Sequence, residues 1–123
     1  MKLNHECVRD LLLFIEEYSD YDVSIDPSSI ELNYDHKDVL YAADKLLEAN
    51  YIDGIKRSFI GSDLPQIAIK SITWDGHLFL DNIRDDTVWG KTKEIAKNFS
   101  SMSLSLIGKI ASQVIIQMVS SQL

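Results

Sequence analysis

Three side chains in the second half of the chain have the types and spacing of a metal site. His77, Asp81 and Asp85 follow one another at intervals of four residues, so on one unbroken helix an imidazole and two carboxylates would line the same face. Such a set could bind zinc or another divalent cation. The alternative is structural: His77 packs beside Trp74 and pairs with Asp81, while Asp85 and Asp86 cap a helix. We favour this interpretation and expect no metal-binding residue.

A second motif resembles the end of a phosphate-binding loop. It consists of Gly90, Lys91 and Thr92, but the glycine required five residues before Gly90 is replaced by Asp85, whose charge would repel phosphate. No nucleophile with a paired base is recognisable elsewhere in the sequence. We therefore expect no catalytic residue, no cofactor and no enzymatic activity.

The single cysteine and the first residues bear on the compartment. Cys7 cannot form an internal disulfide, and it lies four and seven residues before Leu11 and Phe14, which predicts a buried structural thiol. The first ten residues contain Glu6, Arg9 and Asp10, whereas a signal peptide needs an uninterrupted apolar stretch there. These features favour a cytoplasmic protein, and we expect neither a membrane helix nor a membrane partner.

The net charge of −7 is unevenly distributed along the 123 residues. Residues 1–48 hold twelve Asp and Glu against four Lys and Arg, whereas residues 49–123 hold seven against eight. An acidic surface repels the phosphate backbone of nucleic acids. DNA is therefore disfavoured as a partner, although a local basic patch could still bind it.

The apolar periodicity predicts an α+β fold. Asp35 and Thr73 can cap helices, and Asn50 can take the left-handed conformation at a helix end. Residues 73–98 are helical, either as one kinked helix or as two. The predicted elements are helices at 4–18, 35–49 and 104–119, a short strand at 30–32, and hairpin strands at 51–60 and 66–72.

This order of elements is that of a winged-helix-like domain: helix, short strand, helix and β-hairpin wing. We assign residues 1–98 to it, and residues 99–123 to a C-terminal amphipathic helix that packs on the domain or on a second subunit. Residues 73–89 read T-W-D-G-H-L-F-L-D-N-I-R-D-D-T-V-W, and Lys91-Thr92-Lys93 follow soon after. Together these residues resemble a prophage-associated family of unknown function, number twenty-five thirteen among such domains. The resemblance implies a winged-helix fold and a phage or mobile-element setting, and no catalytic residues.

Winged helices often bind DNA through a recognition helix. Here the polar face of helix 35–49 carries four acidic residues against two lysines, and no two-turn amphipathic segment precedes it. The first helix of a helix-turn-helix pair is therefore missing or vestigial. Basic residues in the hairpin, Lys56, Arg57 and Lys70, remain candidates for phosphate contacts, so a DNA-binding transcriptional regulator is our alternative hypothesis.

The C-terminal helix is the most apolar surface. Between residues 100 and 123 the only charged residue is Lys109, so the apolar stripe must pack either on the first helix of its own chain, or on a second subunit or target protein. Our leading hypothesis is a small, non-enzymatic, prophage-type regulatory or interaction protein that binds a host or phage protein, or a second copy in a homodimer. The interface candidates are Ile107, Ile110, Val114, Ile116, Met118 and Trp89.

Overall fold

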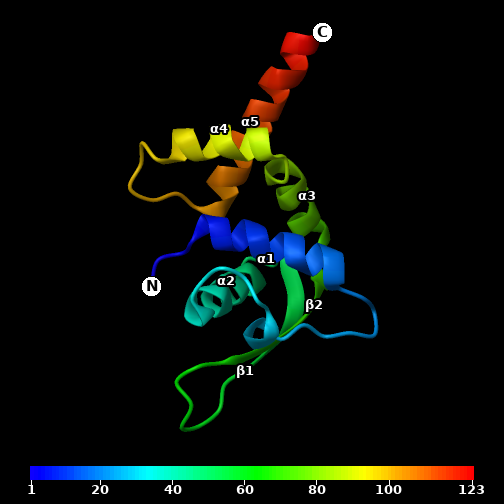
Figure 1. Ribbon diagram of the computed structural model, residues 1–123, viewed down its shortest axis with the longest axis vertical. Helices are drawn as coiled ribbons and strands as arrows, with labels where there is room; N and C mark the ends of the chain where they lie inside the picture. The colour runs from blue at the N-terminus through cyan, green and yellow to red at the C-terminus, as the bar shows by residue number, and fades with distance from the viewer. The chain divides into compact units, whose positions relative to one another are not determined.

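The computed structural model describes residues 1–123 and has an α+β fold, as predicted (Figure 1). It contains five α-helices, one short 3-10 helix and a two-stranded antiparallel sheet. The elements are α1 (His5–Tyr18), η1 (Pro27–Ser29), α2 (His36–Glu48), β1 (Ile52–Arg57), β2 (Gln66–Ile72), α3 (Trp74–Ile83), α4 (Asp86–Ala96) and α5 (Leu104–Gln122).

The chain divides into two compact units. We call them the N-terminal unit, Met1–His77, and the C-terminal unit, Leu78–Leu123. The N-terminal unit carries fifteen Asp and Glu against seven Lys and Arg, whereas the C-terminal unit carries four against five. The acidity of the protein therefore belongs entirely to the N-terminal unit.

The core of the N-terminal unit is formed by one face each of α1, α2 and the hairpin. Apolar residues recur every three or four positions along both helices, so each helix presents a single apolar face. Full burial of a Leu or Ile side chain stabilises the fold by roughly 1.5–3 kcal/mol. The largest fully buried side chains here are Val8, Leu11, Leu12, Ile15, Val39, Leu46, Ile52 and Ile69.

Local signals determine the ends of α1 and α2. The side chain of Asn4 accepts a hydrogen bond from Cys7 N (3.1 Å), and that of Asp35 accepts one from Lys37 N (3.1 Å). Beyond α2, Asn50 has φ of 62°, and Tyr51 N donates to Leu46 O (2.9 Å). The predicted left-handed exit at Asn50 is confirmed, and it turns the chain directly into β1.

The hairpin forms as predicted, except that β1 ends at Arg57 and not at residue 60. The prediction of a short strand at residues 30–32 was wrong. Extended pairing on that side of the sheet is limited to one bridge, in which Ile25 and Ile69 exchange two N–H···O bonds of 2.8 Å. Pro27 then begins η1, and Asp26 caps it by accepting a bond from Ser28 N (2.9 Å). Because proline has no N–H, it ends strand pairing. The three residues of η1 are all that is helical between α1 and α2.

Residues 73–98 form two helices. The hydroxyl of Thr73 accepts a bond from Gly76 N (3.0 Å) and caps α3. After α3 ends at Ile83, Asp85 caps α4 by accepting a bond from Val88 N (3.0 Å). An N-cap residue has non-helical backbone angles, so Asp85 interrupts what would otherwise be one helix.

In the C-terminal unit α4 packs against α5. Figure 1 shows α5 crossing α4, with its last turns projecting beyond it. Gly108 allows α5 to approach Phe79 of α3 closely, because a Cβ at this position would lie 3.1 Å from Cδ1 of Phe79. The helix extends to Gln122, three residues beyond the predicted end.

Candidate interaction surface

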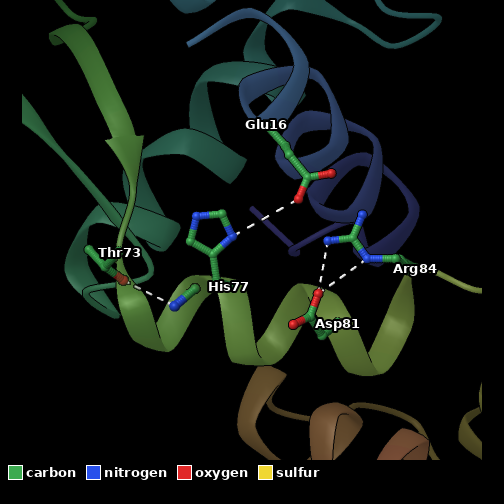
Figure 2. Close-up of polar contacts among 6 residues, drawn as sticks. Glu16, Thr73, His77, Asp81 and Arg84 are labelled. Atoms are coloured by element: carbon green, nitrogen blue, oxygen red, sulfur yellow. Dashed lines mark hydrogen bonds and ion pairs between the residues drawn. The ribbon is translucent and has the colours of Figure 1, made fainter. Parts of the chain in front are cut away.

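Two of the candidate metal residues, His77 and Asp81, lie in separate polar contacts (Figure 2). Nδ1 of His77 lies 4.0 Å from Oε2 of Glu16 within the N-terminal unit. Asp81 pairs with Arg84 (2.9 Å), the residue that follows α3. The expected pair between His77 and Asp81 is not formed. Asp85 lies beyond the end of α3 and is occupied as a helix cap. No group of three His, Cys, Asp or Glu side chains in the structure could hold a metal ion.

The segment that resembles a phosphate-binding loop is the interior of a helix. Gly90, Lys91 and Thr92 lie within α4. Thr92 is fully buried, and its hydroxyl donates to Val88 O (2.8 Å). No backbone loop is present there to surround a phosphate group.

Two titratable groups near α1 are held in their neutral forms. Cys7 is fully buried, and burial, together with the charges of Asp38 and Asp10, raises the pKa of its thiol to about 11. The hydroxyl of Tyr34 donates to Oδ2 of Asp10 (2.6 Å). Burial first, and this hydrogen bond second, raise the pKa of Tyr34. Both groups stabilise the packing around α1 and have no reactive form at neutral pH.

The basic residues of the hairpin do not gather into a cationic surface. Lys56 Nζ lies 2.9 Å from Oδ1 of Asp44, so its charge is already compensated within the chain. On α2, Lys45 pairs with Glu48 (3.0 Å). Arg57 and Lys70 remain exposed, within a unit whose acidic residues outnumber its basic ones by eight.

The C-terminal unit has an open groove between α4 and α5 with a volume of about 710 Å³. Its walls combine apolar and polar side chains, with one acidic and one basic residue. It is lined by Lys91, Glu94, Ile95, Asn98, Val114, Gln117, Met118 and Ser121. A groove of this kind accommodates side chains of a protein partner more readily than a highly charged ligand.

The six interface candidates differ in exposure. Trp89, Ile107 and Val114 are 3%, 2% and 8% exposed. Trp89 and Ile107 belong to the interior, and Val114 contributes only to the wall of the groove. Ile110 and Met118 are half-buried. Ile116 is 53% exposed. The sequence indicated an apolar helix but did not indicate which part of the stripe α4 covers.

Several exposed apolar residues were not among those candidates. Val119 and Leu123 are 51% and 102% exposed, and they follow Ile116 at the helical spacing of three and seven residues. We call Ile116, Val119 and Leu123 the α5 patch. Phe99, between α4 and α5, is 59% exposed, and Trp74 at the start of α3 is 75% exposed.

One helix is long and apolar enough to cross a membrane, although no membrane helix was expected from the sequence. It is α5, with a mean hydropathy of 1.3 over the best window, 28% of which is buried. Ser and Gln residues interrupt its apolar run, so no long uninterrupted stretch indicated it. A single helix of this kind is weak evidence for a membrane span, since core helices of soluble proteins meet the same criteria.

The protein is therefore a small α+β protein with two helices and a hairpin in one unit and a helical second unit. Comparison with protein families shows that residues 2–103 match the family described as "Hypothetical protein (DUF2513)". A protein of Haemophilus influenzae (strain ATCC 51907 / DSM 11121 / KW20 / Rd), described as an uncharacterized protein, is 35% identical over 119 residues, which cover 96% of this chain and 98% of the relative. The chain belongs to the DUF2513 family, which is the family of unknown function that its sequence resembles. No solved structure matches the chain.

Proposed function

We propose that this protein is a small, non-enzymatic regulatory protein of prophage type that acts in the cytoplasm by binding another protein. The observation that carries the proposal is the α5 patch. Its three large apolar side chains, Ile116 and Val119 in the last turns of α5 and Leu123 at its C-cap, are each more than half exposed. After Lys109 no side chain of the chain is charged. Exposed apolar surface without nearby charge is typical of protein-binding sites.

The energetic argument favours a partner at the α5 patch. Moving one exposed Ile, Val or Leu side chain into an interface contributes roughly 1 kcal/mol or more, depending on the area removed from water. The adjacent groove between α4 and α5 provides a concave surface next to the patch, since Val114 and Met118 line it from the neighbouring face of α5. A groove beside the patch matters because binding hot spots cluster in well-packed pockets from which water is excluded.

The order of elements supports a winged-helix domain in the N-terminal unit, with η1 in the place of the first helix of the helix-turn-helix pair. DNA binding by this domain is our alternative. Two observations weigh against it: Lys56 is neutralised by Asp44, and Lys45 is neutralised by Glu48. A recognition helix needs free cations to attract phosphates.

The test is affinity capture from host lysate with the wild-type chain and with the double variant Ile116→Asp, Val119→Asp. We expect the wild type to retain a protein partner, identified by mass spectrometry, and the variant to lose it, because a buried carboxylate in an apolar interface is costly. The matched control is Gln113→Asp, which adds a charge of the same kind at an exposed position of α5 outside the patch. Capture is repeated after nuclease treatment.

Three outcomes would contradict the proposal. A partner retained equally by the double variant would show that the α5 patch does not bind it. Recovery only of nucleic acid, lost on nuclease treatment and weakened by Arg57→Glu with Lys70→Glu, would favour the DNA-binding alternative. Sedimentation of the chain with lipid vesicles, abolished by the double variant, would show that α5 binds a membrane.

A further inference from the structure

The outer edge of β1 is unpaired. The sheet has two strands, and β1 pairs only with β2. On the opposite side, β2 is partly protected by its bridge with Ile25. An unpaired strand edge presents backbone N–H and C=O groups that can pair with another chain. Figure 1 shows the hairpin loop extending away from α1 and α2 within the N-terminal unit.

The backbone directions along β1 follow from the Ile25–Ile69 bridge. Ile69 exchanges both of its hydrogen bonds with Ile25, so its N–H and C=O point away from β1. Its partner in β1 is Gly54, and the next pairs are Ile55 with Ala68 and Lys56 with Ile67. Antiparallel pairs alternate between bonded and non-bonded. The N–H and C=O groups of Gly54 and Lys56 therefore point outward, away from β2.

The hairpin has a register shift between Asp53 and Gly54, where Asp53 pairs with Ser71 and Gly54 with Ile69, so the extra residue, Lys70, lies in β2. The side chains of β1 itself therefore still alternate between the two faces of the hairpin. Ile52 is buried, and Lys56 on the same face reaches Asp44 of α2. Asp53, Ile55 and Arg57 occupy the other face and are exposed, Ile55 to 43%. The exposed row therefore reads acid, apolar, base in the order of the chain.

We propose that β1 pairs with β1 of a second copy of this chain, antiparallel and about a two-fold axis at Ile55. In this register the backbone of Gly54 in each copy exchanges two N–H···O bonds with the backbone of Lys56 in the other copy. The two pairs give four backbone hydrogen bonds. Asp53 lies opposite Arg57 of the second copy at both ends, and the two Ile55 side chains meet at the axis. The two hairpins become one four-stranded sheet.

Charge complementarity selects both the partner and the register. A two-fold axis at Lys56 would place two lysines directly opposite each other, which is destabilising, and an axis at Gly54 would leave Arg57 without a partner. Only the axis at Ile55 matches each acid with a base. An isologous interface requires such self-complementarity. Two features that commonly block an edge strand do not act on β1. It contains no proline, and Asp44 holds the Lys56 side chain on the other face of the hairpin.

The test uses two single variants, Asp53→Lys and Arg57→Glu, analysed alone and as an equimolar mixture by sedimentation velocity. Wild type is expected to form dimers as concentration rises. Each variant alone should self-associate about tenfold or more weakly, because like charges then face each other twice. In a heterodimer of the two variants, the introduced lysine faces the introduced glutamate, and the unchanged Arg57 of one chain faces the unchanged Asp53 of the other. The mixture should therefore dimerise with near wild-type affinity, and differently tagged chains distinguish the heterodimer from the homodimers.

Two controls make the result specific. Asp63→Lys changes the same kind of charge in the hairpin loop outside β1 and should leave the dimer intact. The variant Ile116→Asp, Val119→Asp, which tests the α5 patch, should also leave it intact, so failure of the proposed function and failure of this inference are separable. A monomeric wild type, a dimer unaffected by either β1 variant, or a mixture that stays monomeric would each overturn the inference.

Discussion

The ammonium group of Lys56 in β1 lies 2.9 Å from Oδ1 of Asp44 in α2, which joins the hairpin to the helix that precedes it in the chain. The Asp44 side chain is only 16% exposed, and this oxygen is buried and accepts no hydrogen bond. The charge of Lys56 is therefore what compensates the buried carboxylate. This contact also removes Lys56 from the set of cations available to an external phosphate.

Replacement of Lys56 should therefore destabilise the fold. Lys56→Met keeps the approximate length of the side chain but leaves the Asp44 carboxylate without its cation, and we expect the free energy of unfolding to fall by about 1–3 kcal/mol. Urea denaturation measures the change. In the double variant Lys56→Met, Asp44→Leu the loss should be smaller, because no unpaired charge remains. Equal losses in the single and double variants would show that the ion pair contributes nothing.

Thr73 provides a second contact that can be tested. Its hydroxyl donates to Asn50 O (2.7 Å) and accepts from Gly76 N (3.0 Å), so it links the end of α2 to the start of α3. Thr73→Val removes both bonds with little change in shape, and we expect a loss of about 1–2 kcal/mol. Thr73→Ser retains the hydroxyl and should recover most of that loss. Thermal unfolding followed by circular dichroism distinguishes the two variants.

Two of the helical glycines, Gly76 and Gly90, make a matched pair. A Cβ on Gly76 would overlap Tyr51 O and lie 2.7 Å from Cγ2 of Ile72, whereas one on Gly90 would meet nothing within 4 Å. Gly76→Ala should therefore destabilise the protein strongly or prevent folding. Gly90→Ala should stabilise it by about 0.5–1 kcal/mol, because alanine loses less backbone entropy in a helix. Comparison of the melting temperatures checks both, and a stabilised Gly76→Ala would contradict the close packing.

Local signals in the sequence were sufficient to predict most of the fold. The side chains of Asp35, Thr73 and Asp85 cap helices within three residues of their own positions, so their effect is visible in a short window of sequence. The exit at Asn50 is local in the same sense. These residues determine where α2, α3 and α4 begin and where α2 ends.

Long-range contacts decide the features that sequence patterns did not predict. The strand at residues 30–32 was predicted from alternation, but the residue that pairs with β2 is Ile25. Pro27 begins η1 two residues later, and the extended pairing ends there. Trp89 and Ile107 were interface candidates because they are large and apolar, yet they are buried. Which side of α5 is covered depends on its crossing with α4, and no periodicity within α5 alone contains that information.

Cys7 should make the stability of the protein depend on pH in the alkaline range. Its pKa is about 11 in the folded chain against an ordinary value of 9.0. Below pH 9 the thiol is protonated in both states, so it adds no pH dependence. Between pH 9 and 11 the unfolded chain ionises and the folded chain does not, so the free energy of unfolding falls with rising pH, by about 3 kcal/mol in total.

The contribution of Cys7 is isolated by comparison with Cys7→Ala, since the tyrosines and lysines titrate in both proteins over this range. The difference in unfolding free energy between wild type and variant should be constant below pH 9. Between pH 9 and 11 the unfolding free energy of the wild type should fall relative to that of the variant. Alkylation by iodoacetamide should be slow in the native protein and fast in urea, because the thiolate is the reacting species. Rapid alkylation of the native protein at neutral pH would mean that Cys7 is accessible and ionised, contrary to its burial in the α1 face of the core.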